Sequence, residues 1–216
     1  MTHIGGLYVL IDPAACRGRD PVAVAGAALR GGASLIQWRD KLRDKGEQLG
    51  DARAIYRLCR EHGAYFIAND HADLALALGL AVAPQGLIGV HVGQKDLPVG
   101  SVRRMLPADW VVGISTNNPR EARDGVAAGA TYVAVGDIFG TTAKEGTRRA
   151  SPERLKEVKQ AVDVPVIGIG GINLSNLDQV IAAGADGIAV ISAVCGADNP
   201  EAAARDLVAA MSKARF

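Results

Sequence analysis

Short apolar runs alternate with longer segments rich in Ala and Leu from one end of the chain to the other. The short runs have the length and the Val and Ile content of buried strands, and we predict eight of them, at residues 7–11, 33–38, 65–69, 87–92, 111–114, 132–135, 164–169 and 187–191. The longer segments are predicted as helices, at residues 21–30, 46–61, 72–80, 102–106, 119–128, 152–161, 174–183 and 200–214.

Residues that favour helix ends support several of these boundaries. At four predicted starts a capping residue precedes a proline in the first helical position: Asp20, Asn118, Ser151 and Asn199. Gly63 and Gly184 follow helical segments, where glycine favours a stop.

The alternation predicts an α/β fold, a (β/α)8 TIM barrel formed by residues 1–216 as a single domain. Uninterrupted apolar strands are typical of parallel sheets covered on both faces, and eight strands with crossovers of one hand allow the sheet to close. The length of 216 residues is below the roughly 250 of a typical barrel but within the range of this fold. An open doubly wound sheet is the alternative.

Composition and charge narrow the class of protein. Lys and Arg number 24 and Asp and Glu 23, for a net charge of +1, so nothing indicates binding to nucleic acid or to a membrane surface. The longest apolar stretch, residues 74–83, is too short to cross a bilayer. The high glycine count, 26, together with an aromatic content of only 4%, favours tight turns and an aliphatic core, as in repeated βα units.

The three cysteines indicate a reducing compartment. Cys16, Cys59 and Cys195 are odd in number and far apart, which favours neither a disulfide framework nor a zinc site. Because residues 1–10 also lack the basic start of a leader, we expect a cytoplasmic protein. The predicted outer helices show no single apolar stripe, so the sequence leaves assembly into a homo-oligomer open.

Reactive groups of a TIM barrel lie at the C-terminal ends of its strands and in the loops that follow. After the second strand, Gln37, Arg39 and Lys41 alternate and would face one ligand if the segment stays extended. A solvated charged turn is the alternative for this segment. Ser115 follows the fifth strand, where it would bring a hydroxyl to the same mouth.

Two carboxylates follow neighbouring strands. Asn69 and Asp70 end the third strand and Asp96 follows the fourth, so Asp70 and Asp96 would approach each other at one end of the barrel. Mg²⁺ prefers oxygen ligands and shares its coordination with substrate phosphates, which makes this pair a candidate site for that metal. A helix cap beside an ordinary turn is the alternative.

The glycine-rich segment 168–172, followed by the end of the eighth strand at residues 191–192, predicts a phosphate site, because barrels bind phosphate there with backbone amides. Loop 136–144 is long and carries Lys144, so it is a candidate lid. A phosphate site and a second anion site at one mouth suggest transfer between two phosphorylated small molecules.

The sequence resembles the thiamine-phosphate synthase family nearly end to end. The motifs that carry this resemblance, in chain order, are Leu-Tyr-Val-Leu at 7–10, Gln-Trp-Arg-Asp-Lys at 37–41, Asn-Asp at 69–70, Gly-Val-His-Val-Gly-Gln-Lys-Asp at 89–96, Gly-Ile-Ser-Thr at 113–116, the loop that ends at Lys144, Gly-Ile-Gly-Gly-Ile at 168–172 and Ile-Ser at 191–192.

The resemblance implies an enzyme that joins 4-amino-2-methyl-5-hydroxymethylpyrimidine diphosphate to hydroxyethylthiazole phosphate or its carboxylated precursor, with release of pyrophosphate. It further implies a dissociative reaction assisted by Mg²⁺ on Asp70 and Asp96, with Arg39, Lys41, Ser115 and Lys144 as catalytic residues. The implied ligands of the pyrimidine diphosphate are Gln37, Trp38, Arg39, Asp40, Lys41, Asn69, Ser115 and Lys144. The implied ligands of the thiazole phosphate are Thr141, Thr142, Ala143, Gly171, Ile191 and Ser192.

Loop 136–144 departs from the family pattern. Asp137 and Gly140 replace two prolines, and Ala143 replaces a threonine, from which we expect a looser loop with one hydroxyl contact fewer. Lys95 stands where an acidic residue is common, which lowers the negative charge beside Asp96.

Two other functions fit the barrel, a thiazole tautomerase of the same family and a non-catalytic phosphate-binding barrel. Retention of the diphosphate ligands argues against both. His91 is expected to be a packed or hydrogen-bonded core residue, Trp38 to pack against helices, and Cys195 to have no catalytic role, because no base is paired with it in the sequence.

Overall fold

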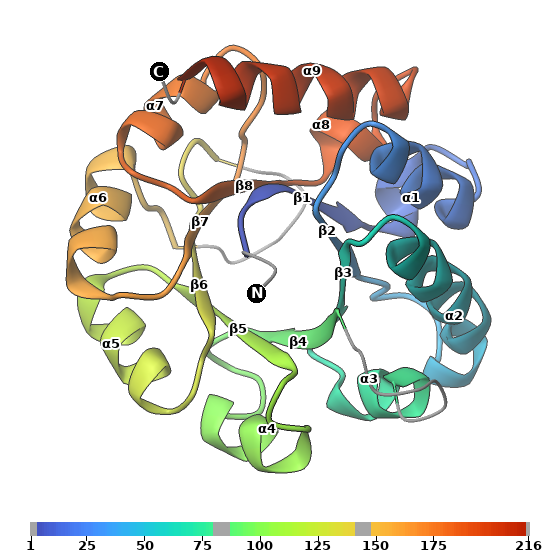
Figure 1. The fold of residues 1–216 in the computed structure, drawn as a ribbon, viewed down its shortest axis with the longest axis horizontal. Coiled ribbons are helices and arrows are strands. Elements are labelled where there is room, and N and C mark those ends of the chain that lie inside the picture. Colours follow the sequence, from blue (N-terminus) through green and yellow to red (C-terminus); the bar gives the residue numbers. More distant parts are fainter. Residues whose placement is uncertain (1–3, 80–86, 141–147, 215–216) are drawn as a thin grey trace.

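Parallel strands close into a barrel in the computed structural model, which describes residues 4–79, 87–140 and 148–214 (Figure 1). The strands follow one another around the barrel in chain order, and the ring closes where β8 pairs with β1 through Leu7 and Ile188. The open doubly wound alternative is therefore wrong. The strands are β1 (Gly6–Ile11), β2 (Leu35–Trp38), β3 (Tyr65–Asn69), β4 (Ile88–Val92), β5 (Val111–Thr116), β6 (Tyr132–Val135), β7 (Val166–Ile169) and β8 (Gly187–Val190).

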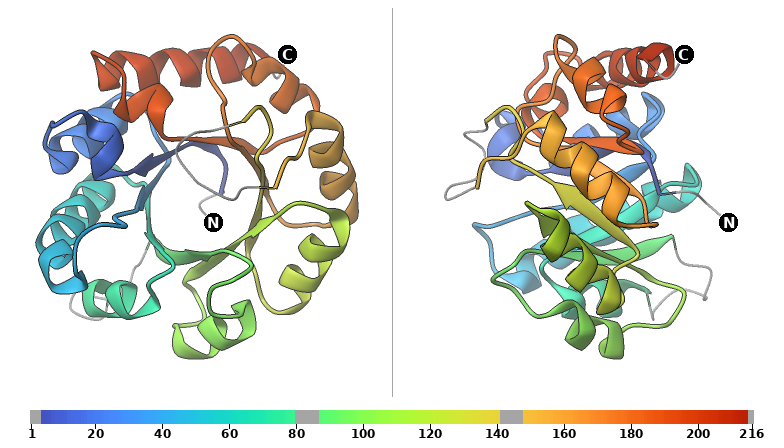
Figure 2. Two further views of the ribbon diagram at one scale, coloured as in Figure 1. Left: turned by 180° about the vertical axis from the view of Figure 1, so that it is seen from behind. Right: turned by 90° about the vertical axis from the view of Figure 1, so that its left-hand side faces the viewer.

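Helices form a ring outside the barrel, as Figure 1 and the left view of Figure 2 show. They are η1 (Pro13–Cys16), a 3-10 turn, and α1 (Pro21–Arg30), α2 (Lys45–Glu61), α3 (Ala72–Gly79), α4 (Val99–Met105), α5 (Pro119–Ala127), α6 (Pro152–Ala161), α7 (Leu177–Ala182), α8 (Ser192–Cys195) and α9 (Pro200–Ala214). The βα alternation predicted from the sequence is confirmed throughout this part of the chain.

The predicted capping residues act as caps. The carboxylate of Asp20 accepts hydrogen bonds from the backbone of Val22 and Ala23, and corresponding bonds start α5, α6 and α9 at Asn118, Ser151 and Asn199. Gly63 and Gly184 have φ angles of +65° and +94°, which residues with a Cβ rarely adopt, so the helices before them stop there.

Some boundaries differ from the prediction for local reasons. Helix α7 begins at Leu177 instead of residue 174, because the side chain of Asn173 accepts hydrogen bonds from Ser175 and holds a turn. Strand β7 begins at Val166, just after Pro165, which has no N–H for the sheet. The short elements η1 and α8 were missed because each has only four residues.

Hydrophobic side chains form one layer on each face of the barrel sheet. One fills the barrel itself with inward side chains such as Tyr8, Leu35, Ile67 and Tyr132. The other lies between the sheet and the helices and includes Trp38, Ile55 and Leu155. Because alternate residues of a strand face opposite layers, the same alternation decides which side chains reach the interior of the barrel.

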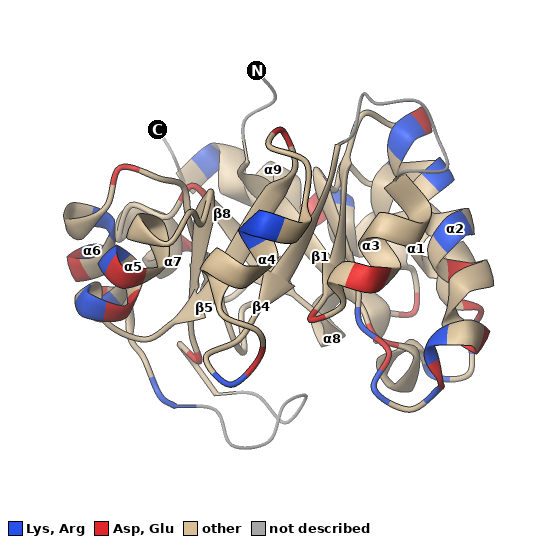
Figure 3. Cartoon of the chain, turned by 90° about the horizontal axis from the view of Figure 1, so that it is seen from below, with Lys and Arg blue, Asp and Glu red and all other residues tan. Residues whose placement is uncertain are grey.

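Charged residues lie outside these layers. None of the strands contains Asp, Glu, Lys or Arg. Figure 3 shows the charges on the outer helices and in loops at both ends of the barrel. Within the described ranges, no helix combines the length and the apolar character needed to span a membrane.

Candidate active site

The C-terminal ends of the strands meet at one mouth of the barrel. This geometry brings together side chains from segments far apart in the sequence, including Arg39 after β2, Asp70 after β3 and Ser115 in β5. Parallel pairing of β2 with β3, β3 with β4 and β4 with β5 fixes this arrangement. The sequence prediction that these strand ends share one mouth is confirmed.

Arg39 forms an ion pair with Asp12, which follows β1. The backbone N–H of Arg39 donates to the carbonyl of Ile11 at 3.0 Å, so the pairing of β1 with β2 continues past the end of β2. The Asp12 carboxylate also caps η1 by accepting from the N–H of Ala14. Both side chains of the pair are only 11% exposed, so the guanidinium is held in a fixed place at the mouth.

Lys41 lies against the end of β3. Its Nζ is 2.5 Å from Oδ2 of Asp70, and the Asn69 side-chain amide donates to the same oxygen at 2.6 Å. Asp70 has a φ of +62°, and its N–H donates to the carbonyl of His91. This backbone conformation places the Asp70 carboxylate where it meets Lys41 and Asn69. A cation, an amide and a carboxylate therefore converge at the end of β3.

Asp96 lies in the loop after β4, the strand that pairs with β3. Its carboxylate accepts the N–H of Gly93 at 2.8 Å and thereby forms a turn next to the strand end. Asp70 and Asp96 supply oxygen donors from neighbouring strand ends, a donor set that fits Mg²⁺ when substrate phosphate and water complete the coordination. No group of three or more His, Cys, Asp or Glu suited to a metal occurs among the described residues.

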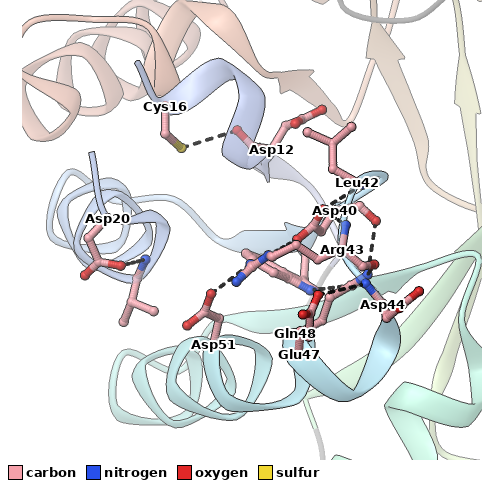
Figure 4. A network of polar contacts seen from close by, with 12 residues as sticks. Asp12, Cys16, Asp20, Asp40, Leu42, Arg43, Asp44, Glu47, Gln48 and Asp51 are labelled. Atoms are coloured by element: carbon pink, nitrogen blue, oxygen red, sulfur yellow. Dashed lines mark hydrogen bonds and ion pairs between the residues drawn. The ribbon is translucent and has the colours of Figure 1, made fainter. Parts of the chain in front are cut away.

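Asp40 and Trp38 build the loop that presents Arg39 and Lys41. Figure 4 shows Arg43 between Asp40 and Asp51, with ion-pair distances of 2.5 and 2.8 Å. Burial alone would raise the pKa of the Asp40 carboxyl, but the N–H groups of Leu42 and Arg43 and the Arg43 guanidinium together lower it. The Trp38 ring is buried against α2 and donates to Gln48 at 3.1 Å, which confirms the expected packing against a helix.

Gln37 and Ser115 face the interior of the barrel. The side chain of Gln37 is buried and its Nε2 donates to the hydroxyl of Tyr8. Ser115 Oγ lies 3.0 Å from Nε2 of His91, whose Nδ1 lies 3.0 Å from the hydroxyl of Tyr132. His91 is thus a hydrogen-bonded core residue, as the sequence predicted.

The base of the loop after β6 is anchored to the end of β7. The N–H groups of Ile138 and Phe139 donate to Ile169 and Gly170, and the Asp137 carboxylate accepts from Gly140. The returning end is held as well, because the amide of Asn117 donates to the carbonyls of residues 136, 148 and 149. Hydrogen bonds thus hold both described ends of the loop, and the expectation of a looser loop stays a prediction, because residues 141–147 lie outside the described residues.

The rest of this loop was predicted to contribute Thr141, Thr142, Ala143 and Lys144, and these four residues lie outside the described residues. Gly171 has a φ of +65°, and a Cβ there would lie 2.3 Å from the carbonyl oxygen of Gly140. Only glycine allows this close approach of loop and strand end.

The end of β8 continues directly into the short helix α8. Ile191 precedes the helix and Ser192 is its first residue, so backbone N–H groups of the first turn lie at the mouth. Arg19 supports this turn, because its guanidinium donates to the carbonyls of Cys195 and Ala197, each at 2.6 Å. Hydrogen bonding with Cys16 and burial raise the pKa of the Cys195 thiol, which keeps it protonated and unsuited to nucleophilic chemistry.

Sequence reasoning missed Asp12, Tyr8, Tyr132 and Arg19. Asp12 follows β1 directly, so the strand-end rule that selected Asp70 would have found it. Tyr8 and Tyr132 lie deep in strands, and only an assignment of the inward face could have singled them out. No local signal shows that Arg19 supports α8, because the carbonyls it binds there are 176 and 178 residues away.

Comparison with known proteins agrees with this geometry. A family model described as thiamine monophosphate synthase matches residues 7–194. A thiamine-phosphate synthase of Roseiflexus sp. is 44% identical over 214 residues, which cover 97% of this chain and 86% of the relative. One from Chlorobium limicola is 44% identical over 196 residues, which cover 90% of each chain.

A solved structure has the same fold. The thiamine phosphate pyrophosphorylase from Pyrococcus furiosus superposes with a TM-score of 0.85 at 32% identity, covering 98% of this chain and 97% of that one. Taken with the family model and the curated relatives, this likeness shows that the chain belongs to the thiamine monophosphate synthase family.

Proposed function

We propose that this chain joins 4-amino-2-methyl-5-hydroxymethylpyrimidine diphosphate to hydroxyethylthiazole phosphate, or to its carboxylated precursor, and releases pyrophosphate. The observation that carries this proposal is the convergence of Arg39, Lys41, Asn69 and Asp70 at adjacent strand ends. Two cations and an amide suit a diphosphate, whereas a tautomerase acting on a monophosphate would have no use for them.

The reaction begins when the bond between the pyrimidine methylene carbon and the diphosphate oxygen breaks, with its electron pair leaving on the pyrophosphate. Arg39 and Lys41, together with Lys144, stabilise the negative charge that grows on this leaving group, and such prearranged charges supply a large part of catalysis. Asp12 and Asp70 hold the two cations in place beforehand. The nitrogen of the thiazole then donates its electron pair to the methylene carbon, and no general base is required.

Asp70 and Asp96 would hold Mg²⁺. When bound there, the ion would neutralise charge on the diphosphate oxygens. Gln37 and Ser115 orient the aminopyrimidine ring from the interior of the barrel, and Trp38 and Asp40 support the loop that carries the cations.

The thiazole phosphate occupies the opposite side of the mouth in this proposal. Gly171, Ile191 and Ser192 offer backbone N–H groups at the ends of β7 and β8, and residues 141–143 belong to the loop whose base lies against Gly171. We place the enzyme in the cytoplasm, in keeping with the three buried free thiols.

The proposal is tested by mixing the purified protein with both substrates, with and without Mg²⁺, and measuring thiamine phosphate and pyrophosphate together. We expect equal amounts of the two products, and neither when EDTA removes the metal. Isomerisation of the thiazole without pyrophosphate would replace the proposal by the tautomerase, and binding of thiazole phosphate without turnover would replace it by the non-catalytic barrel.

Removal of one cation gives a sharper test of the diphosphate site. We expect Lys41→Ala to lower kcat/KM by about 100-fold, because charge stabilisation at the leaving group is lost. Lys45→Ala is the matched control, since Lys45 pairs with the exposed Asp73 on a neighbouring helix and should leave turnover unchanged. Similar losses in both variants would contradict the assigned role of Lys41.

A further inference from the structure

A chain of polar side chains crosses the interior of the barrel beneath the mouth. Gln37 Nε2 donates to the hydroxyl of Tyr8, which is 3.1 Å from the hydroxyl of Tyr132. The Tyr132 hydroxyl is 3.0 Å from Nδ1 of His91, and Nε2 of His91 is 3.0 Å from Oγ of Ser115. The chain thus joins Gln37 on β2 to Ser115 on β5 through three buried groups.

The barrel is shaped to accommodate these groups. Tyr8, Tyr132 and His91 are all buried, and the two tyrosine rings meet edge to face. A Cβ at Gly113 would lie 2.1 Å from Cζ of Tyr132 and 2.5 Å from Nδ1 of His91. Glycine at this position of β5 therefore makes the space in which the phenol and the imidazole meet.

The ends of the chain lie at the mouth. Gln37 is the last inward residue of β2 before Arg39, and Ser115 is the last inward residue of β5. Gln37 Oε1 is a buried side-chain oxygen without a hydrogen-bond partner among the described residues. A buried carbonyl oxygen without a partner is costly, so its presence at the mouth points to a ligand that supplies a donor.

Only one order of the hydrogen bonds uses the hydrogens of both buried phenols within this row of side chains. In that order Nε2 of Gln37 donates to the hydroxyl of Tyr8, and Tyr8 gives its own hydrogen to Tyr132. Tyr132 in turn donates to Nδ1 of His91, which leaves the proton of the imidazole on Nε2 to be donated to Ser115. The hydroxyl hydrogen of Ser115 then points away from His91.

Both phenols keep their hydrogens in this chain. Burial raises the pKa of Tyr8 and of Tyr132 well above the ordinary value for tyrosine, so neither ionises under working conditions. The chain therefore presents an acceptor at Gln37 and a donor at Ser115.

We propose that Tyr8, Tyr132 and His91 are positioning residues that fix Gln37 as an acceptor and Ser115 as a donor toward one flat heteroaromatic ring. The ring that matches has an exocyclic N–H next to an acceptor nitrogen in the ring, as a 4-aminopyrimidine has. This inference rests on the proposed function. It extends that function by assigning three residues that touch no reacting atom but determine which hydrogen bonds the site makes with the ring.

The test removes single hydroxyls from the chain. We expect Tyr132→Phe and Tyr8→Phe each to raise KM for the pyrimidine diphosphate about tenfold, the effect of a weakened hydrogen-bond pair, with KM for the thiazole phosphate unchanged. Tyr56→Phe is the matched control, because this tyrosine packs on Phe66 on the helix side of the sheet and does not belong to the row of hydrogen-bonded side chains from Gln37 to Ser115. Urea unfolding of each variant reports whether it folds.

Calorimetry with the diphosphate-free 4-amino-5-hydroxymethyl-2-methylpyrimidine tests ring recognition apart from turnover. We expect wild type and Tyr56→Phe to bind this pyrimidine with equal affinity, and Tyr8→Phe and Tyr132→Phe to bind it about tenfold more weakly. Equal binding by all four proteins, or a fall in kcat with both KM values unchanged, would overturn the inference. A wild-type protein that binds the ring yet makes no thiamine phosphate would instead refute the proposed function alone.

Discussion

At the scale of single residues, the mouth of the barrel is organised by pairing each cation with a carboxylate. Arg39 is paired with Asp12 and Lys41 with Asp70. The two pairs differ in exposure, because the Arg39 side chain is 11% exposed and that of Lys41 is 48% exposed. Arg39 is thus a fixed charge, while Lys41 has the freedom to follow a ligand.

Asp12 should therefore contribute to stability through Arg39. We expect Asp12→Asn to lower the free energy of unfolding by roughly 2 kcal/mol, because the substitution leaves the mostly buried guanidinium without its counter-charge while asparagine can still cap η1. Urea denaturation measures this change. Asp198→Asn, which removes a fully exposed partner of Arg17, is the control and should have no measurable effect. Equal stability of both variants would contradict this role of Asp12.

At the scale of elements, the loop after β6 and the end of β7 form one unit. The backbone N–H of Phe139 donates to the carbonyl of Gly170. The backbone of Gly171 lies so close to the carbonyl oxygen of Gly140 that a Cβ would not fit between them. Thiazole phosphate ligands are proposed on both parts, so the contact between them should matter for binding as well as for stability.

Two glycines with the same φ of +65° separate these effects. We expect Gly63→Ala to cost about 1 kcal/mol of stability, the backbone penalty alone, and to leave turnover unchanged. Gly171→Ala should also displace the loop, because its Cβ would lie 2.3 Å from the carbonyl oxygen of Gly140 while nothing lies within 4 Å of a Cβ at Gly63. Steady-state kinetics should show a raised KM for thiazole phosphate only in Gly171→Ala; an unchanged KM there would contradict the coupling.

At the scale of the whole molecule, titratable groups limit stability on both sides of neutrality. The Arg148 guanidinium lowers the pKa of Glu121, and the backbone N–H of Leu42 together with the contacts of Arg43 lowers that of Asp40. A carboxyl whose pKa is lower in the folded state contributes stability above its unfolded value, and that stability is lost as the pH falls. Burial raises the pKa of Tyr8 and Tyr132, so the stability they contribute is present below the unfolded value and is lost as the pH rises.

We accordingly expect the urea midpoint to be nearly constant between about pH 5 and 8, and to fall below about pH 4 and above about pH 10, near the unfolded values of carboxyls and phenols. Midpoints measured by far-ultraviolet circular dichroism from pH 3 to pH 11 check this. A midpoint that stays constant from pH 9 to pH 11 would show that the phenols are not linked to folding.

The sequence favours a closed barrel over an open doubly wound sheet, and it predicts the strand ends that carry Arg39 and Asp70 and the helix caps at Asp20, Asn118, Ser151 and Asn199. These features depend on local preferences and on the period of the apolar pattern, both of which can be seen within a few residues. The starts of α4 at Val99 and of α7 at Leu177 were harder to predict. A proline precedes the first, and an Asx turn precedes the second.

Which polar groups meet depends on contacts between strands that are far apart in the sequence. Arg39 and Asp12 are 27 residues apart and Tyr8 and Tyr132 are 124 apart, so no local pattern pairs them. They come together because closure of the barrel fixes the register of neighbouring strands and aims alternate side chains at one interior. Once inside, a buried polar group must find a partner, and that requirement joins Gln37 to Ser115 through a phenol pair and an imidazole.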